Sequence, residues 1–183
     1  MSFKQHIFNW LISKKNVATA NKQFLNWTQL SNVLIVVYDH QLSNCVEFIN
    51  ICKKDKINVQ VAIIFDGKPE HAPKPDFNHL ILDKKQFSIF KMPSKICLQK
   101  LNVEPFDALI NLGNNEQLKA LGLTKMIQAK CKIGNFQNPV FDIIINADKT
   151  MNSSEYLKQV VVYLNMIKTS TKYLNTHILP CNN

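Results

Sequence analysis

The sequence contains no arginine, so all 22 basic residues are lysines, which give the chain a formal net charge of +9. Lysine supplies a point charge but cannot make the bidentate contacts by which arginine reads bases and phosphates. The composition therefore argues against sequence-specific nucleic-acid binding. Because asparagine and isoleucine are also abundant, the lysine excess matches what an AT-rich genome produces whatever the function.

Glycine is scarce, with four among 183 residues, and none lies in a G-x-G-x-x-G, Walker or G-x-S-x-G motif. Loops that hold nucleotide phosphates use glycine so that backbone N–H groups can approach the phosphate closely. The shortage therefore weighs against nucleotide-dependent enzymes, and we expect no cofactor.

The cysteines are odd in number, scattered, and form no C-x-x-C pair: Cys45, Cys52, Cys97, Cys131 and Cys181. Such a set argues against both a disulfide framework and a zinc site. It is typical of a reducing compartment, so we expect a cytoplasmic protein.

No apolar run approaches the ~20 residues that a membrane span needs. The first 30 residues contain no acid, and their apolar residues recur at spacings of three and four. One stripe contains Phe3, Ile7, Trp10 and Leu11, and a second runs through Ala20, Phe24 and Trp27. This pattern predicts a basic amphipathic helix that stays on the protein rather than an export signal.

Residues 1–30 are therefore expected to form a basic helical arm. Three uses remain open for this arm: packing on the following domain, contact with a second copy in a homodimer, or docking on an acidic membrane surface. The arm residues that would make such contacts are Lys4, Trp10, Lys14, Lys15 and Lys22.

A continuous β-branched run predicts a strand that is covered on both faces over residues 33–38. Further apolar segments predict strands over residues 59–65, 79–82, 106–112, 131–134 and 141–145. Helical periodicity predicts helices over about 45–54, 114–127 and 152–168, with Asn114 and Asn152 as caps. Residues 84–104 are ambiguous. An edge strand fits 87–90, and a short helix fits 94–101, with Ile96, Cys97 and Leu101 facing inward.

Alternating strands and helices predict βαβ units, whose crossovers are right-handed. We therefore expect an α/β protein, namely a three-layer Rossmann-like sandwich with a mainly parallel sheet of five to six strands. The α/β domain is expected to span residues 31–168, followed by a polar tail of residues 169–183.

Polar side chains follow the predicted strands, and the carboxyl ends of parallel strands meet at one edge, where ligands bind. The candidate catalytic residues there are Asp39, His40, Asp66 and Asp148. His40 beside Asp39 is the acid/base candidate, and the carboxylates could hold Mg²⁺. We favour the alternative that these residues cap helices and form turns, because their spacing matches no metal motif, and we expect no bound metal.

Two segments carry a resemblance to a known family. Phe106–Leu112 and Ala129–Gly134, separated by a helix, resemble the "YD-L-I-D-L" and "AK-R-IG-F" strands in the N-terminal Rossmann-like domain of lipopolysaccharide heptosyltransferases. The whole chain more closely resembles a family of uncharacterised Bacteroidetes proteins that share a basic N-terminal helix, "FD-LINL", "KA-KIG" and "FD-MI" strands, and a C-terminal amphipathic helix. The "FD-MI" strand corresponds to Phe141–Ile144. These resemblances imply the fold but no activity.

The transferases have a glycine-containing loop after the first strand, a catalytic acid beside it, and a second Rossmann domain for the nucleotide sugar. This chain has no glycine in Tyr38–Asn44 and too few residues for the second domain. Because a fold does not carry chemistry, we favour a non-catalytic ligand-binding or protein-interaction module. The alternatives are a small enzyme at the strand ends (a metal-assisted hydrolase or transferase remnant) and a peripheral membrane or nucleic-acid binder that uses residues 1–30.

Overall fold

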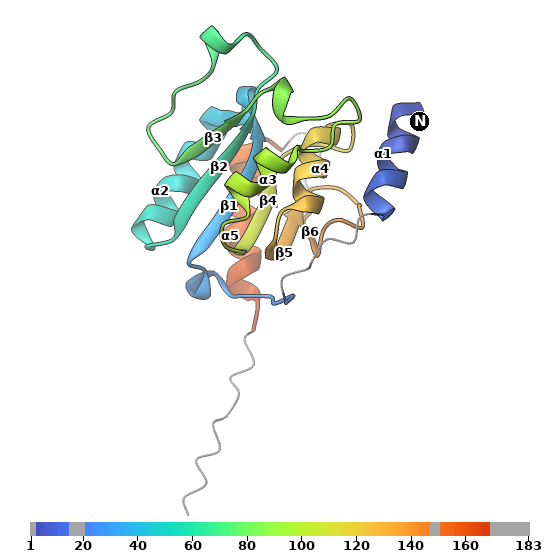
Figure 1. Cartoon of the computed structure of the whole chain (residues 1–183). Helices are drawn as coiled ribbons and strands as arrows, with labels where there is room; N and C mark the ends of the chain where they lie inside the picture. Colours follow the sequence, from blue (N-terminus) through green and yellow to red (C-terminus); the bar gives the residue numbers. More distant parts are fainter. Residues whose placement is uncertain (1–2, 15–20, 147–150, 169–183) are drawn as a thin grey trace, which may run out of the picture.

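A computed structural model describes residues 3–14, 21–146 and 151–168. In this part of the chain, six parallel strands form one sheet in the order β3-β2-β1-β4-β5-β6 (Figure 1). The strands are β1 (Asn32–Tyr38), β2 (Asn58–Ile64), β3 (His79–Leu82), β4 (Phe106–Asn111), β5 (Ala129–Gly134) and β6 (Ile143–Ile144). The helices are α1 (Phe3–Lys14), α2 (Val46–Lys54), α3 (Lys95–Leu101), α4 (Leu118–Met126) and α5 (Ser153–Met166). The predicted α/β Rossmann-like fold is confirmed.

Helices cover both faces of the sheet, α2 and α5 on one and α3 and α4 on the other (Figure 1). Successive side chains of a strand point to opposite faces. Accordingly, Val33 and Ile35 of β1 pack in the core on the α2 and α5 side, whereas Leu34 and Val36 pack in the core on the α3 and α4 side. This double coverage explains why the central strand β1 is a continuous apolar run without polar alternation.

Helix α1 packs on the outer side of α4. Phe8 is fully buried and shares a small hydrophobic cluster with Met92, Leu121 and Phe141. The predicted apolar stripe is therefore correct only in part: Leu11 packs against this cluster, but Trp10 remains 54% exposed while Phe8, which the stripe omitted, faces the protein. As a consequence α4 is covered from two sides, and most of its side chains are buried.

Three local expectations are corrected. Residues 87–90 form no strand, because Phe87 makes only an isolated bridge to Pro93 at the base of a tight loop. Helix α3 exists and is capped by Ser94, but Ile96 is 65% exposed instead of facing inward. The helical stripe through Phe24 and Trp27 is not formed either, since a short 3₁₀ turn, η1 (Trp27–Gln29), follows an irregular segment.

Helix α4 starts later than predicted, because the expected cap forms a separate turn. Asn114 Oδ1 accepts a hydrogen bond from Glu116 N, and Gln117 Oε1 accepts one from Asn114 N. The other cap is confirmed: Asn152 Oδ1 accepts from Glu155 N at 3.0 Å, and the Glu155 carboxylate accepts from Asn152 N at 3.1 Å.

None of the helices within residues 3–14, 21–146 and 151–168 combines the length and apolar character that a bilayer span requires.

Candidate functional site

The strand order places a switch point between β1 and β4, because β2 and β3 extend the sheet on one side of β1 and β4 to β6 extend it on the other. In open parallel sheets, the crevice at the carboxyl end of this point is the usual ligand site. A cleft of about 620 Å³ lies there. The described residues that line it are His40, Gln41, Leu112, Asn114, Asn115, Gln117, Asn135, Phe136, Met151, Asn152, Ser153 and Tyr156.

Four segments supply the walls of this cleft, each following directly from the fold. The 3₁₀ segment η2 (Asp39–Cys45) continues from β1, and the 112–117 turn follows β4. Asn135 and Phe136 follow β5, and the first turn of α5 completes the ring. The cleft is therefore built from the carboxyl ends of three neighbouring strands and one helix start.

The Gln41 side chain of η2 connects its own segment by polar contacts to the turn after β4 and to the first turn of α5. Its Nε2 donates to the Leu112 carbonyl at 2.9 Å and lies 3.4 Å from Ser153 Oγ, and its Oε1 accepts from Tyr38 N at 3.1 Å. All of its amide contacts are thus made within the protein. Gln41 shapes the cleft and has little capacity left for a ligand.

Hydrogen bonds of the fully buried Asn111 side chain hold the turn after β4 in place. Its Nδ2 donates to Thr124 Oγ1 at 2.8 Å, and its Oδ1 accepts from Gly113 N at 2.6 Å. A Cβ atom on Gly113 would lie 2.9 Å from that oxygen and 2.8 Å from the Ala120 Cβ. Glycine is therefore required at this position for the close approach of the turn to α4.

Two buried polar atoms in residues of the cleft lack partners within the described structure, Tyr156 OH and Asn135 Oδ1. Tyr156 is 2% exposed, and burial raises the pKa of its hydroxyl above the ordinary value, so it is a neutral donor and acceptor. An unsatisfied buried polar group costs about 1–3 kcal/mol. Such atoms call for a partner that the described residues do not supply.

The candidate residues from the sequence do not lie together. His40 lines the cleft with 64% of its side chain exposed, and its Nδ1 is 3.8 Å from Asp39 Oδ1. Asp66 lies at a different hollow and pairs with Lys119. Asp148 lies outside the described residues. Their proposed catalytic role stays a prediction.

The hollow beside Asp66 has a volume of about 190 Å³ and is also lined by Tyr38, Lys91 and Lys119. Lys119 is almost fully buried, and its ammonium lies 5.1 Å from the centre of the Phe87 ring. Burial and the nearby Asp66 raise the pKa of Tyr38 to about 12. Across the described ranges, no three His, Cys, Asp or Glu side chains are placed to share a metal ion.

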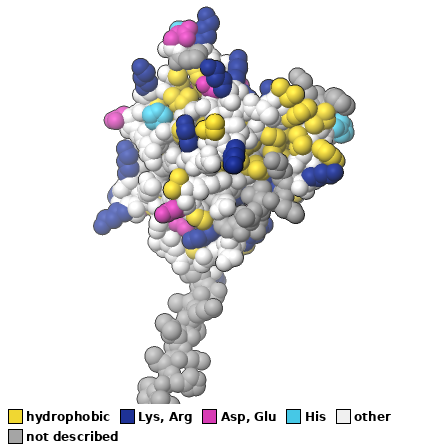
Figure 2. All heavy atoms as spheres, in the orientation of Figure 1, with side chains coloured by type: hydrophobic (Ala, Val, Ile, Leu, Met, Phe, Trp, Pro, Cys, Tyr) yellow, Lys and Arg dark blue, Asp and Glu magenta, His cyan; other side chains and the backbone are white. Residues whose placement is uncertain are grey.

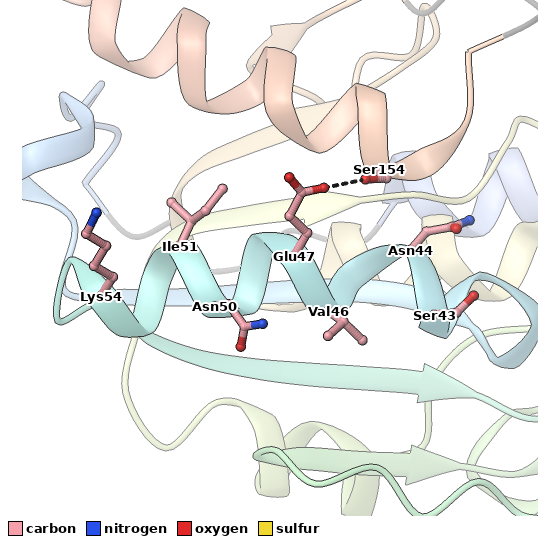
Figure 3. A pocket seen from close by; sticks show the side chains of 8 residues that line it. All are labelled: Ser43, Asn44, Val46, Glu47, Asn50, Ile51, Lys54 and Ser154. Carbon is pink, nitrogen blue, oxygen red and sulfur yellow. Dashed lines mark hydrogen bonds between the residues drawn. The ribbon is translucent and has the colours of Figure 1, made fainter.

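A third hollow follows α2 beside the start of α5 (Figure 3). Its polar groups largely bind one another: Glu47 accepts from Ser154 Oγ at 3.2 Å and from Lys158 Nζ at 3.0 Å. Figure 3 shows Val46 and Asn50 pointing to the opposite side of α2 from Glu47, so the lining side chains do not converge on one point. This hollow is a weaker candidate than the cleft.

Cysteine chemistry is disfavoured in the part of the chain that the structure covers. All four cysteines there are free and buried, and burial raises the pKa of the thiols of Cys45, Cys52 and Cys131 to about 12 and that of Cys97 to about 11. The thiolate is the nucleophilic form, so these side chains act as small core residues.

Sequence reasoning missed the two residues with unpartnered atoms. Asn135 follows β5 directly, so the strand-end rule that selected Asp39 and Asp66 would have selected it as well. Tyr156 gave no such signal, because a tyrosine at an inward position of a helix is typical of a core residue.

The comparisons agree with this fold. In solved structures, the chain is similar to a crystal structure of a glycosyl transferase family 9 protein from Veillonella parvula DSM 2008, with 17% identity and a TM-score of 0.52. The match covers 81% of this chain and 44% of that one, so the chain spans less than half of its structural neighbour. This likeness supports the fold alone. No curated protein matches the chain. Residues 2–167 match the model of a family of unknown function, DUF6913, and the chain belongs to that family.

Proposed function

We propose that this protein is a ligand-binding α/β module whose site is the cleft at the carboxyl ends of β1, β4 and β5. The observation that carries the proposal is the pair of unpartnered buried atoms, Tyr156 OH and Asn135 Oδ1, in residues that line this cleft. Unpartnered polar atoms in residues that line the crevice at the switch point of a parallel sheet favour a polar small molecule as the ligand.

Binding rather than catalysis is favoured by what the lining residues can do. His40 is the titratable candidate in the cleft, and its imidazole is 3.8 Å from the nearest Asp39 oxygen, which is too long for an orienting hydrogen bond. The other described lining groups are carboxamides, hydroxyls and apolar side chains, which position ligands but do not transfer protons near neutral pH.

We also propose a cytoplasmic location for the protein. The free cysteines among the described residues support it, because thiols stay reduced in that compartment.

Amide chemical shifts and melting temperature test the proposal on the full chain. The probes are D-glucose, adenosine, glycine and inorganic phosphate, chosen to differ in charge and polarity. We expect at least one probe to raise the melting temperature and to shift the amides of residues 112–117 and 151–156. Binding to the native state at ~100 times Kd stabilises it by about 2.7 kcal/mol.

The matched variants are Asn135→Ala in the cleft and Asn50→Ala on α2. The first should abolish the response and the second should leave it intact. If no probe changes either the melting temperature or the cleft amides, or if both variants respond alike, the cleft is not the binding site and the proposed function is wrong.

A further inference from the structure

The composition of the cleft defines the chemistry of what it binds. Charged residues make up 19% of the chain, yet none of the described lining residues is Asp, Glu or Lys. Half of those residues are instead Asn or Gln: Gln41, Asn114, Asn115, Gln117, Asn135 and Asn152. Carboxamides both donate and accept hydrogen bonds, so they match ligand groups that do the same. Gln41 is engaged within the protein, and the side-chain oxygens of Asn114, Gln117 and Asn152 accept backbone hydrogen bonds. Among the described contacts, the NH₂ groups of those last three residues and the side-chain amides of Asn115 and Asn135 are left for a ligand.

From this lining we infer that the cleft takes an uncharged ligand that carries several hydroxyl or amide groups and one apolar face. The inference deepens the proposed function and rests on it. An anionic ligand would give up hydration in a cleft whose described lining contains no lysine and has the exposed His40 imidazole as its possible cation, and a cationic ligand would find no Asp or Glu side chain in that lining.

Backbone amides are the usual alternative holders of an anion, and three of them around the turn after β4 are already bonded within the protein. Gly113 N donates to Asn111 Oδ1, Asn114 N to Gln117 Oε1, and Glu116 N to Asn114 Oδ1. These three amides are therefore not free to hold a phosphate.

The N-terminus of α5 already holds a carboxylate of this chain. Glu155 N donates to Asn152 Oδ1, and Asn152 N donates to the Glu155 carboxylate at 3.1 Å. The partial positive charge of a helix start favours an anion. Here the Glu155 carboxylate already occupies that position, so a second negative charge would be repelled.

The apolar part of the lining supplies the complementary surface for a ring. Phe136 is half-buried and packs edge-on against Phe141, with ring centres 5.2 Å apart. Leu112 and Met151 are further apolar residues in the lining. A pyranose or a nucleobase has an apolar face bounded by hydrogen-bonding groups, and both satisfy the same inference.

Pairs of probes that differ by one phosphate test the charge requirement directly. The pairs are D-glucose with glucose 6-phosphate, and adenosine with adenosine monophosphate, titrated into the full-length protein by calorimetry. We expect the neutral member of one pair to bind at least tenfold more tightly than its phosphorylated partner. The pair that responds shows whether the ligand is a sugar or a nucleoside.

Tyr156→Phe and Asn135→Ala connect the affinity to the cleft. Each removes one hydrogen-bonding group, so each should weaken the neutral probe about tenfold or more, whereas Asn50→Ala should have no effect. Tighter binding of the phosphorylated member, still lost in Asn135→Ala, overturns the inference but leaves the site in place. Absence of binding by all four probes, or binding that both cleft variants leave unchanged, overturns the inference and the proposed function together.

Discussion

At the scale of the residue, Asp107 near the start of β4 links the amino ends of the strands on either side, β1 and β5. One carboxylate oxygen accepts from Ser31 N at 2.7 Å and Asn32 N at 3.0 Å, and the other accepts from Lys130 Nζ at 2.7 Å. Burial acts to raise the pKa of this carboxyl, but the hydrogen bonds from Lys130 and the two backbone amides outweigh it and hold the pKa below its ordinary value.

The substitution Asp107→Asn should therefore lower the free energy of unfolding by about 2 kcal/mol at neutral pH, because charge-assisted hydrogen bonds are lost. A carboxyl whose folded pKa is depressed contributes stability above its unfolded pKa of about 4 and loses it as the pH falls through the folded value. The difference between wild type and variant should thus shrink as the pH falls below about 4.

Urea unfolding at a series of pH values measures this difference, with Asp76→Asn in an exposed loop as the control. The control should be close to wild type throughout. A difference between wild type and Asp107→Asn that is independent of pH would show that packing, and not the charge, stabilises this corner.

Tyr156 shows where sequence reasoning stops at this scale. Its inward position in α5 follows from the helical stripe that also contains Leu157 and Val160. That its hydroxyl has no partner among the described residues depends on η2, the 112–117 turn and the residues after β5, which meet at the cleft only in the folded chain. A buried tyrosine can be predicted from periodicity, but an unsatisfied one cannot.

At the scale of the element, the docking of α1 on α4 is the arrangement that the sequence left open. Phe8 is the fully buried residue at this contact, whereas Trp10 lies on the outside with Lys14 Nζ 4.3 Å from its ring centre. Trp10 and Phe8 are both large and aromatic, so Trp10→Ala is a matched control for Phe8→Ala on the same helix.

The substitution Phe8→Ala should release α1 from the domain. Removing a buried Phe side chain costs about 3 kcal/mol, and α1 touches the rest of the protein mainly through this cluster. Amide hydrogen exchange in α1 should therefore accelerate about 100-fold while β1 and β4 stay protected. Trp10→Ala should leave the exchange of α1 close to wild type.

Loss of protection throughout the sheet in Phe8→Ala would instead show that α1 and the sheet unfold as one unit. If Trp10→Ala accelerated exchange in α1 as much as Phe8→Ala does, the docked face would be the one first predicted from the sequence.

The strands were predictable because each is covered on both faces, and a short, continuous β-branched run favours a buried strand over a helix. The segment after β3 was not predictable in the same way. Ser88 N donates to the Met92 carbonyl and Lys91 N to the Ser88 carbonyl, which closes a loop with Lys91 at φ 63°. The apolar residues 87–90 matched a strand, but these local hydrogen bonds of Ser88 and Lys91 determine the structure.

At the scale of the whole molecule, the net charge of +9 is distributed and partly paired. Figure 2 shows lysine side chains spread over the visible face without a single dense patch. Among the described residues, four lysines are paired with carboxylates: Lys22 with Asp142, Lys119 with Asp66, Lys130 with Asp107, and Lys158 with Glu47. The sequence predicts the total charge correctly, but the pairing depends on the fold.

This distribution predicts weak, salt-sensitive attachment to acidic membranes. Each lysine near an anionic leaflet contributes about 1 kcal/mol, and salt screens this attraction over ~8 Å at physiological ionic strength. The apolar face of α1 that contains Phe8 is already packed on α4, so it is not free to insert. In co-sedimentation with phosphatidylcholine vesicles that contain phosphatidylserine, we therefore expect binding at low salt that disappears at physiological salt. Trp10→Ala should behave like wild type.

Binding that survives physiological salt and is lost in Trp10→Ala would mean that the exposed face of α1 inserts into the bilayer. Residues 1–30 would then be a membrane anchor.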